Sequence, residues 1–245
     1  MFSSPVSARA LCLYASLLTL SVPAGAADGE AIIQKGGANP AAMPCMSCHG
    51  VDGKGMAAGG FPRLAGLPEA YIAKQLADFK AGRRENPLMQ PIAQALGEAE
   101  AAAVAKAYAS QPKVSIKAGP VERPKEGSGA WLALRGAWER NIPECTLCHG
   151  PAGVGVGDVF PPLAGQSAEY IEAQLRAWRG TPAQLAGKKS KALAAVPATR
   201  RNDPNGLMQH IAADLSEAEI KAVSAYFAGL GESTEPFDES QHRLR

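Results

Sequence analysis

The chain has 245 residues, which suits one or two domains, and its 46% hydrophobic and 20% charged residues are typical of a globular protein. A formal charge of +2 gives no overall attraction to nucleic acid or to an anionic membrane, so we expect neither as a partner. Aromatic residues make up only 6% of the chain, so we expect another kind of group to fill part of the core.

Residues 1–27 predict an export signal. Arg9 supplies a positive charge, residues 10–22 form an apolar run, and residues 24–26 form a small-residue cleavage site. The apolar run is shorter than the ~20 residues that a transmembrane helix needs. We therefore expect cleavage near Ala26 and a periplasmic protein that is soluble or only loosely associated with the membrane. An uncleaved anchor is the alternative.

The rest of the sequence contains two copies of one pattern. The copies share, in the same order, C-x-x-C-H-G, F-P-x-L-A-G, Y-I-x-x-Q-L and L-M-Q-x-I-A motifs. Two copies predict two similar domains, because a solenoid needs more repeats. The second copy has extra residues at 181–199. The motifs begin at Cys45, Phe61, Tyr71 and Leu88 in the first copy and at Cys145, Phe160, Tyr170 and Leu207 in the second.

These copies predict a first domain at 28–112 and a second at 130–231, joined by a Pro- and Gly-rich linker at 113–129 and followed by a polar tail at 232–245. Apolar periodicity predicts helices over 71–80 and 170–179. A capping box from Ser216 to Glu219 opens the last helix, and Gly97 caps its counterpart in the first domain. No alternating strand pattern is present, so the predicted fold is all-α.

Each C-x-x-C-H motif is the attachment signature of a c-type haem. Two thiols add to the vinyl groups of the porphyrin, and the adjacent histidine binds the iron. A disulfide, a redox dithiol and a zinc site are the alternatives. None of them needs a histidine after the second cysteine in both copies, so we expect two covalently bound haems. The residues are Cys45, Cys48 and His49 in the first copy and Cys145, Cys148 and His149 in the second.

The second axial ligand of each iron is predicted to be a methionine. Met208 is the only methionine after His149, and its partner in the first copy is Met89. A methionine in a helical protein is often core filler, but the repeat pairing favours the ligand role. His210 is the rival ligand for the second haem, although its repeat partner is Pro91.

On these motifs, residues 32–230 resemble the cytochrome c4 family, whose members are two fused class I cytochrome c domains. The resemblance implies two tandem helical domains, each wrapped around one haem. It also implies that the backbone carbonyls of Pro62 and Pro161 accept a hydrogen bond from the ring N–H of the axial histidine. The segment at 181–199 departs from the family pattern close to Met208.

The resemblance implies an electron carrier, because His and Met fill both axial positions and leave no site for a substrate. A dedicated electron-transfer subunit of a periplasmic dehydrogenase is one alternative. The other is a catalytic dihaem enzyme, which would need an open or unusual iron site.

A basic cluster in the inserted segment suggests where a redox partner docks. Lys188, Lys189 and Lys191 are followed by Arg200 and Arg201. The functional interpretation is that the cluster steers an acidic redox protein, and the alternative is an ordinary solvated surface.

Overall fold

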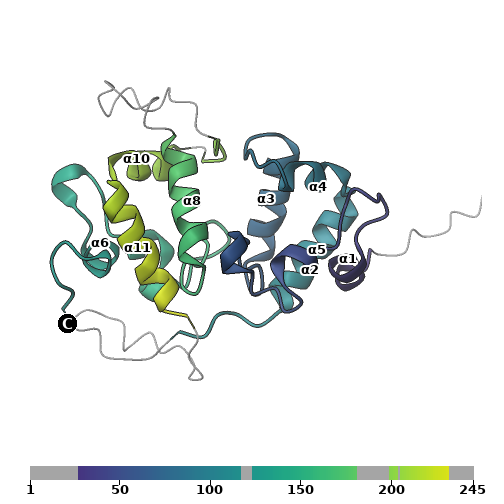
Figure 1. Cartoon of the computed structure of the whole chain (residues 1–245), viewed down its shortest axis with the longest axis horizontal. Helices are drawn as coiled ribbons and strands as arrows, with labels where there is room; N and C mark the ends of the chain where they lie inside the picture. The colour runs from purple at the N-terminus through teal and green to yellow at the C-terminus, as the bar shows by residue number, and fades with distance from the viewer. Residues whose placement is uncertain (1–26, 117–122, 181–198, 204, 232–245) are drawn as a thin grey trace, which may run out of the picture.

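The computed structural model describes residues 27–116, 123–180, 199–203 and 205–231 (Figure 1). These residues form helices and isolated β-bridges without a sheet, which confirms the predicted all-α class. No helix within these ranges is long and apolar enough to cross a membrane. The predicted signal up to Ala26, the three inserted lysines and the polar tail lie outside the described residues.

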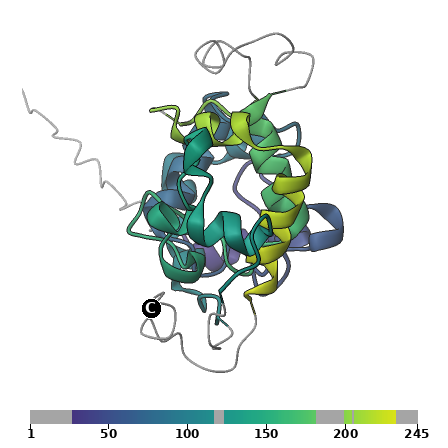
Figure 2. The same ribbon diagram turned by 90° about the vertical axis from the view of Figure 1, so that its left-hand side faces the viewer.

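The described parts of the two halves contain the same succession of α-helices. They lie one after the other along the long axis, and the second half stands in front of the first in the end-on view (Figures 1 and 2). The first half contains α1 (Gly29–Lys35), α2 (Met46–His49), η1 (Ala57–Gly59), α3 (Glu69–Lys80), α4 (Met89–Ala95) and α5 (Glu98–Ser110). The second half contains α6 (Gly129–Arg135), η2 (Trp138–Arg140), α7 (Cys145–His149), η3 (Pro151–Gly153), α8 (Ala168–Arg179), α10 (Leu207–Asp214) and α11 (Glu217–Gly229).

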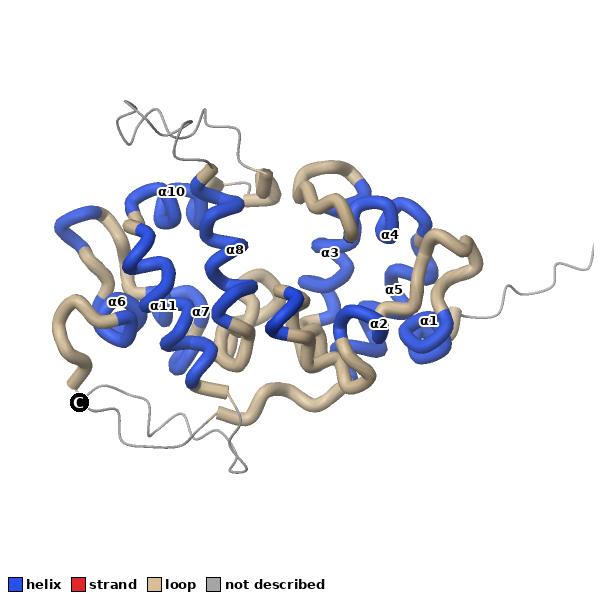
Figure 3. Tube along the Cα trace, in the orientation of Figure 1, coloured by secondary structure: helices blue, strands red, loops and turns tan. Residues whose placement is uncertain are grey.

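The ends of the helices follow the local sequence, and long loops join them (Figure 3). Ser216 caps α11: its hydroxyl accepts from Glu219 N–H at 3.3 Å, while the Glu219 carboxylate accepts from Ser216 N–H at 2.9 Å. In α5 the Gly97 N–H donates to Glu100 at 2.8 Å. Both predicted helix starts are therefore confirmed, as are the helices predicted over 71–80 and 170–179.

One glycine in each domain lets the first helix cross the last at very short range. A Cβ atom on Gly29 would lie 2.2 Å from the carbonyl oxygen of Ala103 in α5. A Cβ atom on Gly129 would lie 2.0 Å from the carbonyl oxygen of Ala222 in α11. Only glycine permits these contacts, so the two crossings α1–α5 and α6–α11 hold each domain together in the same way.

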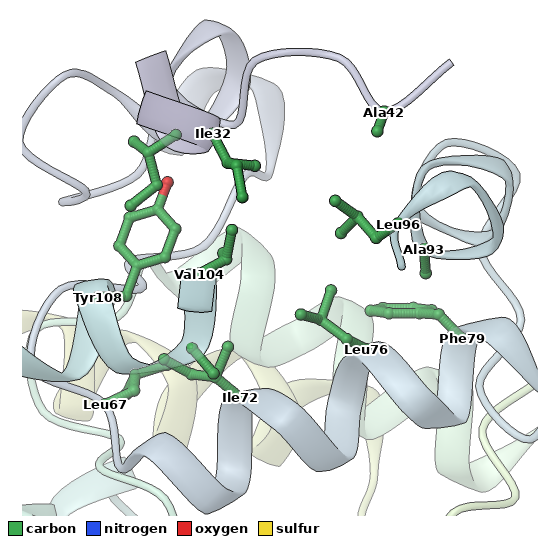
Figure 4. Packing of buried hydrophobic residues seen from close by; sticks show 12 residues of the cluster. Ile32, Ala42, Leu67, Ile72, Leu76, Phe79, Ala93, Leu96, Val104 and Tyr108 are labelled. Atoms are coloured by element: carbon green, nitrogen blue, oxygen red, sulfur yellow. The ribbon is translucent and has the colours of Figure 1, made fainter. Parts of the chain in front are cut away.

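Aliphatic residues from α1, α3, α4 and α5 form the core of the first domain (Figure 4). Phe79 and Tyr108 are its largest buried rings, and Tyr108 has no solvent exposure. Phe227 takes the place of Tyr108 in the second domain and is 1% exposed. Among the described residues, Phe79, Tyr108 and Phe227 are the buried aromatic side chains, while Trp138 is exposed.

Two apolar residues near the start of the predicted linker pack against the second domain. Ile116 has no solvent exposure and forms a β-bridge with Gly231. Together with Val114 it packs against Ala152 and Ala164. The density of proline and glycine identified the connection, but two apolar residues within it act as part of the second domain.

Helices α3 and α8 lie on the two sides of the domain boundary in the middle of the molecule, and α8 contacts η1 of the first domain (Figure 1). The loops that follow these helices also pair, because Arg84 and Arg200 form an antiparallel β-bridge. Glu85 N–H donates to the carbonyl of Thr199 at 2.7 Å, and Arg201 N–H donates to that of Arg83 at 2.7 Å. The inserted segment therefore returns to the fold at the domain interface.

Two candidate haem-binding sites

Each C-x-x-C-H motif forms one short turn of helix. The two cysteines are three residues apart, so their side chains lie on the same face of that turn. All four cysteines are half-buried free thiols, with no disulfide among the described residues. His49 and His149 end the two turns and are buried, with 6% and 7% exposure. The arrangement places two thiols and one imidazole on a single helical turn in each domain.

A backbone carbonyl fixes the orientation of each histidine. His49 Nδ1 lies 2.9 Å from the carbonyl oxygen of Pro62, and His149 Nδ1 lies 2.8 Å from that of Pro161. Because a carbonyl only accepts, Nδ1 carries the proton and Nε2 keeps its lone pair. Burial lowers the pKa of both imidazoles, which keeps them neutral. Each histidine therefore offers Nε2 as a metal ligand.

The cysteine environments fit thioether attachment better than the alternatives. Burial raises the pKa of Cys145 to about 12 and also raises the pKa of Cys45. A redox dithiol needs a reactive thiolate, which the burial of these two thiols disfavours. In the part of the chain that the structure describes, no three His, Cys, Asp or Glu side chains gather into a group that could hold a metal ion.

The predicted methionine ligands occupy equivalent places. Met89 is the first residue of α4, and Met208 is the second residue of α10. Both are half-buried and pack against the core of their own domain. His210 is exposed on α10, which makes it the weaker candidate. The ligand role of both methionines stays a prediction.

The starts of the two methionine helices are held by different residues. In the first domain Asn86 Oδ1 accepts from Met89 N–H at 2.8 Å. In the second domain Asp203 Oδ2 accepts from Gln209 N–H at 3.0 Å. The inserted segment lies shortly before Asp203, so the second domain reaches an equivalent helix by a different loop.

Two phenylalanines that the sequence did not single out as site residues also belong to the sites. Phe61 and Phe160 meet the histidine rings edge-on, with centroids 6.3 and 6.1 Å apart. The indole N–H of Trp178 is buried and has no acceptor among the described residues. A carboxylate of a haem would supply one, so the site fits that group. The repeated F-P pair was the available signal for the two phenylalanines.

Comparisons with known proteins agree with this geometry. The cytochrome c family model matches residues 27–108 and 143–231. A protein of Stutzerimonas stutzeri (strain A1501), called thiosulfate dehydrogenase electron acceptor, is 55% identical over 215 residues, covering 88% of this chain and 92% of that protein. A cytochrome c4 of Thiocapsa roseopersicina is 40% identical over 191 residues, covering 77% of this chain and 88% of that protein.

A solved structure, thiosulfate dehydrogenase (TsdBA) from Marichromatium purpuratum, has a similar fold with a TM-score of 0.65 and 38% identity. The similarity covers 85% of this chain and 40% of that longer one. Two family matches, two equivalent sites and relatives that span nearly the whole chain lead to one conclusion. The chain belongs to the cytochrome c family and is a dihaem electron-transfer cytochrome of the cytochrome c4 type.

Proposed function

We propose that this chain is an exported carrier that accepts single electrons from a thiosulfate-oxidising dehydrogenase and passes them to another redox protein. The haems supply the one-electron couples. The chain would hold each of them through two cysteine sulfurs, a histidine and a methionine. These are Cys45, Cys48, His49 and Met89 in the first domain and Cys145, Cys148, His149 and Met208 in the second.

The observation that carries the proposal is the fixed orientation of the two buried histidines. A carrier needs ligands that keep one geometry in both oxidation states, since ligand movement slows electron transfer. The proline carbonyls prevent rotation of both imidazoles, at 2.9 and 2.8 Å from Nδ1. Filled axial positions would leave the protein no place for a substrate, which favours a carrier over a catalytic dihaem enzyme.

The choice of donor rests on the relatives. One relative bears the name thiosulfate dehydrogenase electron acceptor, and the longer chain with a similar fold is a thiosulfate dehydrogenase. These names support a dedicated dehydrogenase partner over a general shuttle.

Stopped-flow reduction tests the donor. Purified oxidised protein is mixed with a thiosulfate dehydrogenase and thiosulfate, and the haem absorption bands are followed. We expect rapid reduction that requires both components. If dithionite reduces the protein while the dehydrogenase and thiosulfate do not, the carrier role stands and the donor is wrong.

Export to the periplasm is supported by the apolar run and the cleavage site in residues 1–27. We expect a mature protein that begins at Ala27 or Asp28, recovered from the periplasmic fraction. N-terminal sequencing and cell fractionation test this, and a protein that keeps Met1 in the membrane fraction would contradict it.

The basic cluster of the inserted segment is proposed as the docking site for an acidic partner. Lys188, Lys189 and Lys191 carry the positive charge, and they lie outside the described residues. Replacing all three with glutamine should slow reduction by the dehydrogenase, most strongly at low ionic strength. Equal rates at every salt concentration would contradict a steering role.

A further inference from the structure

The carbonyl that orients His49 belongs to a peptide group that also reaches into the second domain. On one side of this peptide, the Pro62 oxygen lies 2.9 Å from His49 Nδ1. On the other side, Arg63 N–H donates to Gln166 Oε1 at 3.0 Å. Gln166 Nε2 in turn donates to the Arg63 carbonyl at 2.7 Å. A single glutamine of the second domain therefore binds the backbone next to the proximal histidine of the first.

Gln166 is well placed to hold this contact. It is 5% exposed, and its backbone N–H is fixed by the carbonyl of Leu163 at 3.2 Å. A buried amide that makes two hydrogen bonds to one residue has little freedom to turn. The structure therefore holds Gln166 in one fixed orientation at the interface.

The second domain has no equivalent of this arrangement. Pro161 orients His149 at 2.8 Å, but the next residue is Pro162, whose nitrogen carries no hydrogen. The repeat partner of Gln166 in the first domain is Leu67, which is 6% exposed and apolar. Within the described residues, the hydrogen-bonded chain from histidine to peptide to glutamine therefore occurs at the first haem site and not at the second.

Hydrogen bonds in a chain strengthen one another. When Arg63 N–H donates to Gln166, the same peptide's carbonyl becomes a better acceptor for the His49 N–H. A stronger acceptor at Nδ1 makes the imidazole a more basic ligand, and a more basic ligand favours ferric over ferrous iron.

We propose that Gln166 is a positioning residue which, from the second domain, strengthens His49 as a ligand and lowers the reduction potential of the first haem. The proposal rests on the ligand role of His49 in the proposed function. It makes the potential of one haem depend on the docking of the other domain.

The test uses the full chain with both haems bound. Gln166→Leu places the repeat partner's residue at this position, and Arg63→Pro removes the N–H but keeps the Pro62 carbonyl, as in the second domain. Reduction potentials are followed for each haem separately by NMR during a redox titration. In both variants the ratio of reduced to oxidised first haem should rise by at least about two-fold at a fixed solution potential. The same ratio for the second haem should not change.

Tyr170→Phe is the matched control. It removes a different hydrogen bond across the interface, the one from Arg84 to the Tyr170 hydroxyl at 2.8 Å, and leaves the Gln166 contact in place. It should leave the first haem unchanged. The His49 ring-proton shift, observed by NMR, should move in the Gln166 and Arg63 variants only.

Unchanged potentials in Gln166→Leu and Arg63→Pro would overturn the proposal. So would an equal shift in Tyr170→Phe, because loosening of the interface would then be the cause. Failure of the proposed function is seen separately, as an unmodified chain whose mass shows fewer than two haems or whose His49 binds no iron.

Discussion

Arg84 and Arg200 come from opposite domains and donate to the same two glutamine oxygens. Gln174 Oε1 accepts from Arg84 at 2.8 Å and from Arg200 at 3.0 Å. Gln75 Oε1 accepts from the same two guanidinium groups at 3.0 and 3.3 Å. Both arginines are buried, with 7% and 5% exposure. Two like charges are thus held side by side by neutral acceptors.

Aromatic rings complete the environment of these arginines. Arg84 lies 4.5 Å from the ring centroid of Phe79, and Arg200 lies 3.7 Å from that of Trp178. Both rings offer the negative face of an aromatic system to a cation. Burial and the charge of Arg84 lower the pKa of Arg200.

We expect Arg84→Met to lower the free energy of unfolding by about 1–3 kcal/mol, because Gln75, Gln174 and Tyr170 would lose a buried hydrogen-bond donor. Urea unfolding of the holoprotein measures the loss. The control is Arg135→Met at an exposed position of α6, which should change stability by less than about 0.5 kcal/mol. Equal stability of the two variants would show that Arg84 contributes nothing to the interface.

The ligand role of Met208 predicts a change at one haem. In Met208→Ala the haem should stay attached through Cys145, Cys148 and His149. The potential of this haem should fall, and carbon monoxide should bind to it. The near-infrared sulfur-to-iron band of the oxidised protein should lose about half its intensity, because one of two such sites would be gone.

His210→Ala is the control for Met208→Ala and should keep the full band. If instead the band survives Met208→Ala and both potentials stay the same, the ligand assignment is wrong. His210 would then be the candidate, and an enzymatic role would gain support.

We expect the ion pair of Glu219 to make the stability of the second domain depend on pH. Its carboxylate binds Arg140, and that contact holds its pKa at about 2, below the usual 4.5. The resulting stability is complete above the usual pKa and is lost as the pH falls toward about 2. Glu219→Gln should therefore cost about 1–2 kcal/mol at pH 7, after allowance for solvent screening, and progressively less as the pH falls through about 2.

Chemical unfolding at several pH values measures this difference. The control is Glu169→Gln at an exposed position in the first turn of α8, which should show a much smaller dependence on pH. A difference between wild type and Glu219→Gln that stays constant from pH 7 to pH 2 would contradict the ion-pair explanation.

Because α6 and α11 cross so closely, we expect one added methyl group to lower the stability of the second domain. In Gly129→Ala the new Cβ would lie 2.0 Å from the carbonyl of Ala222, so the helices must separate. We expect a loss of about 1–3 kcal/mol and a lower melting temperature of the second domain.

Gly229→Ala is the matched control, because nothing lies within 4 Å of its Cβ position at the end of α11. There the exchange should be neutral or slightly stabilising, since alanine favours a helix. Similar melting temperatures for the Gly129 and Gly229 variants would contradict the close crossing.

The sequence predicts those parts of the structure that depend on residues close together in the chain. The helix start at Ser216 and the turn that holds Cys145 and His149 follow from local sequence, and the repeats reproduce both in the first domain. The paired C-x-x-C-H motifs led to the two haems, and the repeats as a whole carried the resemblance to the cytochrome c4 family. The crossing glycines Gly29 and Gly129 lie outside the repeated motifs and carried no sequence signal of their own.

The interface could not be predicted in this way. Arg63 and Gln166 are 103 residues apart, and Gln166 has a leucine as its repeat partner. Arg200 follows an insertion, so no repeat alignment pairs it with Arg84. Such contacts depend on how two finished domains dock, and that is decided by the shape and charge of whole faces.

The reciprocal use of Gln75 and Gln174 has a consequence for how such a chain can arise. Each domain offers the other the same face, and each arginine binds a glutamine of its own domain and one of its neighbour. This is the contact pattern of an isologous homodimer with a two-fold axis. Once both halves share one chain, their association no longer depends on protein concentration. Either domain can then acquire a loop that binds a particular partner, or a different haem potential, while the two domains stay associated.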